Sequence, residues 1–236
     1  MIENNDFINF FFIKKNSFLI TSFLKTNLKC LYKNELILDN SESKLINDQF
    51  KQFLDLNIHK IEKLNNQFIK DINLVIYNDN FLPINIGIKK NISGHFNFEK
   101  ERLNLLSKIK NEIELNNKDL SIIHLLLDNI LINDEYIDIK KNKESLICKF
   151  FSIEAKFIML PQSKIVEYQK LFSDYQIFIN KIISGDHVKK ISLVDQVQEI
   201  DAALDIFLGN HSKEVILLTK KFENKGFFEK FFHLFG

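Results

Sequence analysis

A chain of 236 residues is long enough to bury the core of one large domain or of two small ones. Its 32 Lys and Arg residues nearly balance its 31 Asp and Glu residues, and Arg102 is the only arginine. Binding to nucleic-acid phosphates needs a broad basic excess, so this composition argues against a nucleic-acid partner. Cys30 and Cys148 lie far apart and are expected to be buried, reduced thiols of an intracellular protein.

The first part of the chain has the pattern of a sheet followed by a long helix. Strands are predicted at 7–13 and 18–24, with further strand candidates at 28–32 and 35–38. Apolar residues at helical spacing from Ile46 to Phe68 then predict a helix. A strand at 72–77 comes next. Strands, a helix and another strand in this order are typical of a helix packed on a mixed sheet.

The stretch from Leu82 to Leu160 has the order strand, helix, strand, strand. Apolar residues alternate with polar ones at 82–88 and 151–159, as in half-buried strands, and 122–127 is an apolar run that fits a central strand. Asn97 is positioned to cap a helix that extends to Ile113. We expect a compact α+β unit, and no residue pattern within it indicates an active site.

The elements after this unit are a helix from Pro161 to Ser173, a strand at 176–183 and one helix at 188–208, which Gly209 ends. Residues 209–225 are expected to be a linker. Asp186 is expected to be the N-cap of the last helix.

Neither the histidines nor the glycines form a site pattern. The six histidines have no Cys or carboxylate at metal-ligand spacing, so no metal site is predicted. His124 is interpreted as a hydrogen-bonded core histidine. The six glycines are isolated, so no glycine-rich phosphate loop is predicted.

The C-terminal residues 226–236 predict an amphipathic helix. A helix of this length spans about 14 Å and cannot cross a hydrocarbon core of about 30 Å, but it can lie on the membrane surface. Basic residues beside the apolar face would meet anionic head groups. The alternative is that the apolar face packs back onto the domain. The predicted membrane-binding residues are Phe227, Phe228, Phe231, Phe232, Leu234, Phe235, Lys225 and Lys230.

In this order, the elements resemble the N-terminal half of FtsA, the family of actin-like bacterial cell-division proteins. Residues 69–76 resemble the strand that leads into the inserted SHS2 domain of the family, and Leu82 to Leu160 resembles that domain, with 154–158 as its last strand. The segment 225–232 resembles the C-terminal helix by which the family attaches to the membrane.

The resemblance implies an α+β fold in which an actin-like (ribonuclease H-like) half-domain with a mixed sheet carries an inserted SHS2 domain. The half-domain would comprise 7–80 and 161–208, and the SHS2 domain 81–160. The linker at 209–225 would lead to the membrane-targeting helix at 226–236.

The sequence departs from the family at the nucleotide site. The first phosphate loop of the family carries an Asp-x-Gly pattern in the opening hairpin, whereas Lys14 to Ser17 contains neither residue. The second phosphate loop belongs to a half of the family that this sequence does not contain. We therefore expect no ATP and no other cofactor, no catalytic residue and no enzymatic activity.

The function that the resemblance implies is that of a non-enzymatic, membrane-associated adaptor or scaffold of bacterial cell division. It would be cytoplasmic and peripheral on the inner membrane, and its SHS2 domain would bind another division protein or a second copy of the chain. One alternative is a divergent actin-like ATPase that another chain completes. The other is a soluble scaffold whose Phe-rich tail docks into a protein groove.

Overall fold

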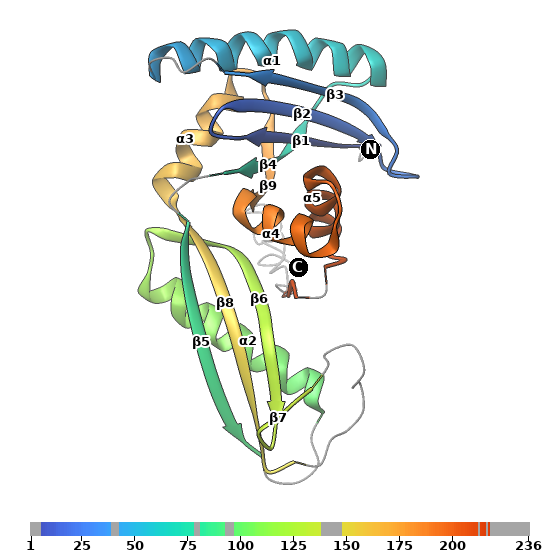
Figure 1. The fold of residues 1–236 in the computed structure, drawn as a ribbon. Helices are drawn as coiled ribbons and strands as arrows, with labels where there is room; N and C mark the ends of the chain where they lie inside the picture. The colour runs from blue at the N-terminus through green and yellow to red at the C-terminus, as the bar shows by residue number, and fades with distance from the viewer. Residues whose placement is uncertain are drawn as a thin grey trace, which may run out of the picture.

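The computed structural model describes residues 6–38, 43–77, 81–92, 97–137, 148–211, 213–215 and 217, and the side chains of all of these except 43–47. They form two units, which we call the core unit and the inserted unit. The core unit is a five-stranded sheet with helices on both faces, and the inserted unit is a four-stranded sheet that projects from it with one helix along it (Figure 1).

The sheet of the core unit is mixed, as predicted. Its order is β3-β2-β1-β4-β9, where β1 to β3 form an antiparallel meander and β4 and β9 run parallel to β1. The prediction of two short strands at 28–32 and 35–38 was wrong, because β3 pairs with β2 along its whole length. The strands are β1 (Phe7–Ile13), β2 (Ser17–Leu24), β3 (Cys30–Ile37), β4 (Asp71–Ile76) and β9 (Phe178–Ser184).

Helices cover both faces of this sheet, so its central strand β1 is apolar at nearly every position. Phe11 points to the layer formed by α1 (Ser43–Asn65) and α3 (Gln162–Ser173), where it contacts the rings of Phe18, Phe50, Phe53 and Phe172. Its neighbours Phe10 and Phe12 point to the opposite layer, formed by α4 (Gly185–Asp195) and α5 (Glu199–Leu208).

Two details at the last helices correct the predictions. The single helix predicted at 188–208 is two helices, because Gln196 takes a left-handed conformation (φ 55°) and ends α4. Asp186 does not cap α4. Ser184 does, since its side chain accepts a hydrogen bond from the backbone N–H of His187, and Asp186 lies in the first turn.

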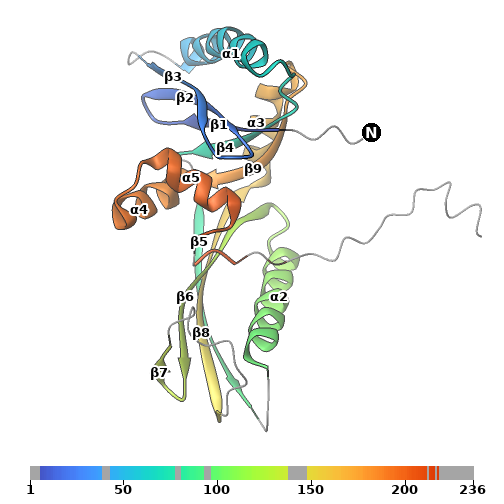
Figure 2. The ribbon, with the colours of Figure 1, turned by 90° about the vertical axis from the view of Figure 1, so that its right-hand side faces the viewer.

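The inserted unit confirms the predicted order of strand, helix, strand and strand, with a short extra strand β7. Its sheet order is β5-β8-β6-β7, all antiparallel, and α2 lies along one face (Figure 2). Asn97 caps α2 as predicted, accepting from the N–H of Lys100. The elements are β5 (Leu82–Asn91), α2 (Phe98–Asn116), β6 (Leu120–Ile132), β7 (Glu135–Tyr136) and β8 (Phe150–Pro161).

These two units confirm the predicted α+β fold class, in which a part with a mixed sheet carries an inserted strand-helix-strand-strand unit. Cys148 is buried, but the prediction that Cys30 is also buried was wrong, because β3 is an edge strand and leaves Cys30 exposed. Among the described residues, no helix has both the length and the apolar character needed to cross a membrane.

Candidate functional site at the junction of the two units

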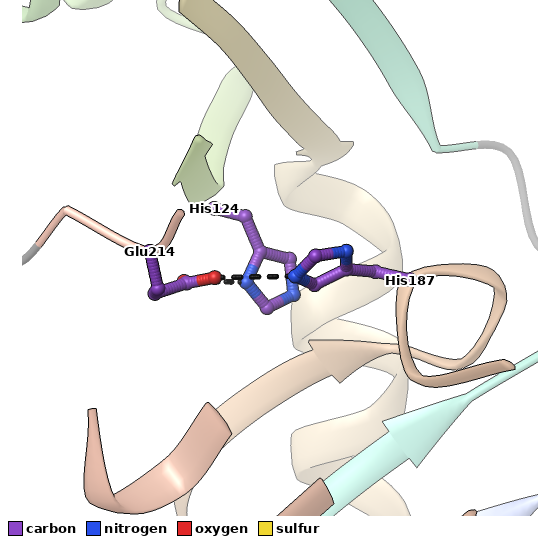
Figure 3. Close-up of side chains that lie close together, drawn as sticks. All are labelled: His124, His187 and Glu214. Atoms are coloured by element: carbon purple, nitrogen blue, oxygen red, sulfur yellow. Dashed lines mark hydrogen bonds and ion pairs between the residues drawn. The ribbon is translucent and has the colours of Figure 1, made fainter. Parts of the chain in front are cut away.

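Three ionisable side chains from distant parts of the chain meet where the two units join (Figure 3). His124 comes from β6 of the inserted unit, His187 from the first turn of α4, and Glu214 from the segment that follows α5. One nitrogen or oxygen atom of each lies within 4.8 Å of those of the other two. We call these three residues the junction cluster.

Three hydrogen bonds join the cluster to itself and to the core unit. Nδ1 of His124 lies 2.8 Å from Oε1 of Glu214, and Nε2 of His187 lies 3.3 Å from Oε2. The backbone N–H of Ser184 donates to Nε2 of His124 at 2.9 Å. Water is nearly excluded, because the side chains of the three residues are 0%, 5% and 5% exposed.

This pattern fixes the proton on His124. Because its Nε2 accepts the N–H of Ser184, its Nδ1 must carry the ring proton and donate it to Glu214. His187 donates from Nε2 to the other carboxylate oxygen. Each oxygen of Glu214 therefore accepts a bond from a neutral imidazole, which is how a buried carboxylate can stay ionised.

The pKa values of Glu214 and His187 are both lowered, for different reasons. Burial raises the pKa of Glu214, but the interactions with His124 and His187, of which the hydrogen bonds are the larger, outweigh burial and hold the pKa at about 2. Burial lowers the pKa of His187, and the bond to Glu214 offsets only part of that effect. Near neutral pH, Glu214 is therefore ionised and His187 is neutral.

The segment that carries Glu214 pairs with the edge of β6. The N–H of Leu127 donates to the carbonyl of Lys213 at 2.8 Å, and the N–H of Val215 donates to the carbonyl of Leu125 at 2.9 Å. Val215 and Leu217 pack against the apolar core of the inserted unit. This part of the predicted linker at 209–225 is therefore fixed to the inserted unit.

The cluster has the donor types of a metal site, but its hydrogen bonds disfavour a metal ion. A histidine that binds a metal through one nitrogen usually donates its other N–H to an acceptor. The second nitrogen of His124 instead faces the N–H of Ser184, which is itself a donor. We therefore interpret the cluster as a hydrogen-bonded connection, in agreement with the prediction that His124 is a hydrogen-bonded core histidine.

Sequence reasoning missed the cluster because its members are far apart. Glu214 lies 90 residues from His124 and 27 from His187. The available signal was the short apolar run that begins at Val215 in an otherwise polar segment. Such a run indicates that the segment packs somewhere, although it does not say where.

A second polar group lies at the turn between β1 and β2, where the resemblance places the first phosphate loop. Nζ of Lys14 and the hydroxyl of Tyr77 both lie 2.9 Å from Oε2 of Glu199, and Nζ lies 5.5 Å from the centre of the Tyr77 ring. Burial and then Glu199 raise the pKa of Tyr77, so the hydroxyl stays protonated and donates. These three residues line one side of an open cavity of about 460 Å³.

The predicted membrane-binding residues lie outside the described residues, so the prediction for the tail stays a prediction. They are Phe227, Phe228, Phe231, Phe232, Leu234, Phe235, Lys225 and Lys230.

The sequence matches none of the protein-family models and none of the curated proteins with which it was compared. Among solved structures, it is similar to the cytoplasmic domain of EpsL, an inner-membrane component of the type II secretion system of Vibrio cholerae, with 6% identity over 77% of this chain and a TM-score of 0.35. It is also similar to a PilM–PilN type IV pilus biogenesis complex, with 8% identity over 80% of this chain and a TM-score of 0.40.

A third similar structure is a protein of unknown function from Bacteroides thetaiotaomicron with an actin-like ATPase fold, with 15% identity over 82% of this chain and a TM-score of 0.32. This chain spans 57%, 50% and 60% of the lengths of the three matched chains, in the order given. Similarities at this level carry no information about the residues of the site.

Proposed function

We propose that this chain is a non-enzymatic, membrane-associated adaptor of bacterial cell division. It binds a partner protein or a second copy through the face of the inserted sheet that none of the described elements covers. The observation that carries the proposal is this face. The helix α2 lies along one side of the sheet (Figure 2). On the other side, Asn85, Gly87 and Lys89 of β5 and Glu154 of β8 are exposed. We call these four residues the open face.

The area of the sheet surface around the open face indicates a weak contact. Over about ten residues, three strands present about 500 Å² if they are spaced about 4.8 Å apart and rise about 3.3 Å per residue. A standard interface buries about 800 Å² on each partner. We therefore expect a weak single contact that becomes firm when several copies gather on one surface.

Gly87 is the best place to test the open face. It pairs across the strands with Glu154, and a Cβ built on it meets nothing within 4 Å. Gly87→Lys adds bulk and a charge opposite a carboxylate without crowding the fold, since opposite charges across strands are favourable. The matched control is Asn104→Lys on α2, which adds the same side chain at an exposed helical position.

Self-association is the readout that needs no other protein. We expect sedimentation velocity of the full chain on a concentration series to show dimers that Gly87→Lys weakens at least tenfold and Asn104→Lys leaves unchanged. If the chain stays monomeric, purified division proteins tested with the same variants examine the alternative partner. Equal behaviour of the two variants in both assays would contradict the role of the open face.

The group at the β1–β2 turn supports a non-enzymatic role. Lys14, Tyr77 and Glu199 bind one another where the resemblance places a phosphate loop, and the turn has no acidic residue for a nucleotide-bound Mg²⁺. We expect calorimetric titration with Mg-ATP to give no saturable binding. Saturable binding that Lys14→Ala abolishes would instead favour the divergent ATPase that another chain completes.

The membrane part of the proposal depends on the tail at 226–236. Each buried Phe contributes about 1.5–3 kcal/mol, but ordering the helix and immobilising the protein offset much of this. We expect the full chain to sediment with vesicles that contain phosphatidylglycerol, and a chain ending at Asn224 to stay in solution. Equal sedimentation would exclude the membrane role. Tail-dependent capture of a purified division protein without vesicle binding would favour the soluble scaffold.

A further inference from the structure

We propose that the junction cluster is a proton-sensitive clasp, which holds residues 213–215 on the edge of β6 near neutral pH and releases them in mild acid. The clasp stands on the geometry of His124, His187 and Glu214 and is independent of the proposed function.

The cluster ties together three parts of the chain that otherwise have few links. His124 belongs to the inserted unit, and its Nε2 bond to Ser184 reaches the core unit at the end of β9. Glu214 joins both imidazoles to the C-terminal segment. On the β6 edge, the same segment has the two backbone hydrogen bonds of Lys213 and Val215. Without the Glu214 carboxylate, two buried ring N–H groups would lose their acceptor, which is costly in a site without water.

The protonation states of the two histidines explain why acid would open the clasp. Both nitrogens of His124 are used, one as a donor and one as an acceptor. A second proton on Nε2 would place two donors opposite each other, so the ring would have to move away from Ser184. His187 is buried, and burial holds its pKa below its ordinary value of 6.5. In the closed state, His187 therefore resists protonation, whereas in the open state it is free to take up a proton.

Two charged groups act in opposite directions on His187. Lys190 of α4 disfavours a positive charge there, whereas the Glu214 carboxylate favours one. His211 also faces His187, with the ring centres 5.8 Å apart, and its own pKa is lowered by burial. The other charged groups that face the cluster or its neighbours come from α2, β6, β8, β9, α4 and the C-terminal segment. They are Lys110, Asp128, Lys156, Lys181, Asp186, Asp195 and Lys213.

The coupling between proton binding and opening sets how strongly the open fraction depends on pH. Glu214 stays ionised, because its pKa of about 2 lies far below the range of interest. Because His187 takes up a proton more readily in the open state, the ratio of open to closed molecules increases by up to about tenfold per pH unit below its ordinary pKa of 6.5. We therefore expect little opening at pH 7.5 and an increase of about tenfold in the open fraction at pH 5.5.

Hydrogen exchange of the full chain measures the opening directly. Protection factors, corrected for the intrinsic rates at each pH, should fall about tenfold between pH 7.5 and pH 5.5 for the amides of Leu127 and Val215. The protection factor of the Phe11 amide, in the centre of the core sheet, should not change. Protection of Leu127 and Val215 that is the same at both pH values would overturn the proposal.

Variants separate the clasp from general acid sensitivity. His187→Gln keeps an N–H that can reach Glu214 but cannot take up a proton, so we expect it to reduce the pH dependence of exchange. Glu214→Gln should raise the exchange of Val215 at both pH values. The matched control, His59→Gln at an exposed position of α1, should behave as the unmodified chain. Full pH dependence in His187→Gln would contradict the clasp.

A measurement on the unmodified chain removes any dependence on how the variants fold. Imidazole nitrogen NMR shifts at pH 7.5 should show His124 as the tautomer with the proton on Nδ1, which is the minor form in solution. The tautomer with the proton on Nε2 would overturn the assignment. Submicromolar binding of Zn²⁺ that both His187→Gln and Glu214→Gln abolish would also overturn it, since it would make the cluster a metal site.

Discussion

Replacing Gly185 by alanine should strongly destabilise the core unit, although the glycine lies at the start of a helix, where alanine is normally favourable. Gly185 is the first residue of α4, and its backbone lies against the face of the Tyr77 ring. A Cβ on Gly185 would lie 2.4 Å from two carbons of that ring and 2.7 Å from a third. Ordinary contacts between carbon atoms are about 3.5–4.0 Å, so the ring must move by about 1 Å.

The ring of Tyr77 cannot move freely, because its hydroxyl is bound to Glu199 and Lys14 lies over it. Overpacking costs about 1–3 kcal/mol, and the loss of a hydrogen bond to a charged group costs about 1.5–3 kcal/mol. The higher helix propensity of alanine stabilises the fold by up to about 1 kcal/mol and so offsets part of this loss. We therefore expect Gly185→Ala to lower the free energy of unfolding by about 2–4 kcal/mol.

Urea denaturation followed by circular dichroism measures this loss. The matched control is Gly87→Ala in β5, where a Cβ meets nothing within 4 Å, and it should be neutral or slightly stabilising. In a Tyr77→Ala background, Gly185→Ala should cost little, because the ring that it strikes is gone. Equal stability of Gly185→Ala and Gly87→Ala would refute the argument.

Three further predictions concern the core, a helix cap and pH. Phe11→Ala should lower the free energy of unfolding, measured by urea denaturation, by about 3–5 kcal/mol, because the ring is completely buried among four other rings. The control Phe178→Ala should lower it by less than about 0.5 kcal/mol, since Phe178 is 75% exposed. Asn97→Ala should lower the free energy of unfolding by about 1 kcal/mol, because it removes the side chain that caps α2. The control Asn104→Ala, at an exposed position of the same helix, should leave it unchanged. The free energy of unfolding should fall as the pH drops below 6.5, by up to about 1.4 kcal/mol per pH unit for His187, because the unfolded side chain takes up a proton before the folded one. A titration in which His187→Gln keeps the full slope would contradict this sign.

The secondary structure followed from the sequence where the signal was local. The run of phenylalanines in β1, the alternation in β5 and the Asn97 cap each depend on residues within one element, and the structure has all three. The failures also have a local reason. The break at Gln196 involves no glycine or proline, so no residue type marked the end of α4.

The sequence by itself determined the order of the elements, because the periodicity of apolar residues shows which side of each helix or strand is buried. Only the tertiary structure decided which surfaces and side chains meet. The pairing of the strands assigned Asn85, Gly87 and Glu154 to one face, and all three are exposed. The return of the chain to β6 brought Glu214 to His124 across 90 residues, and no local pattern encodes a contact of that range.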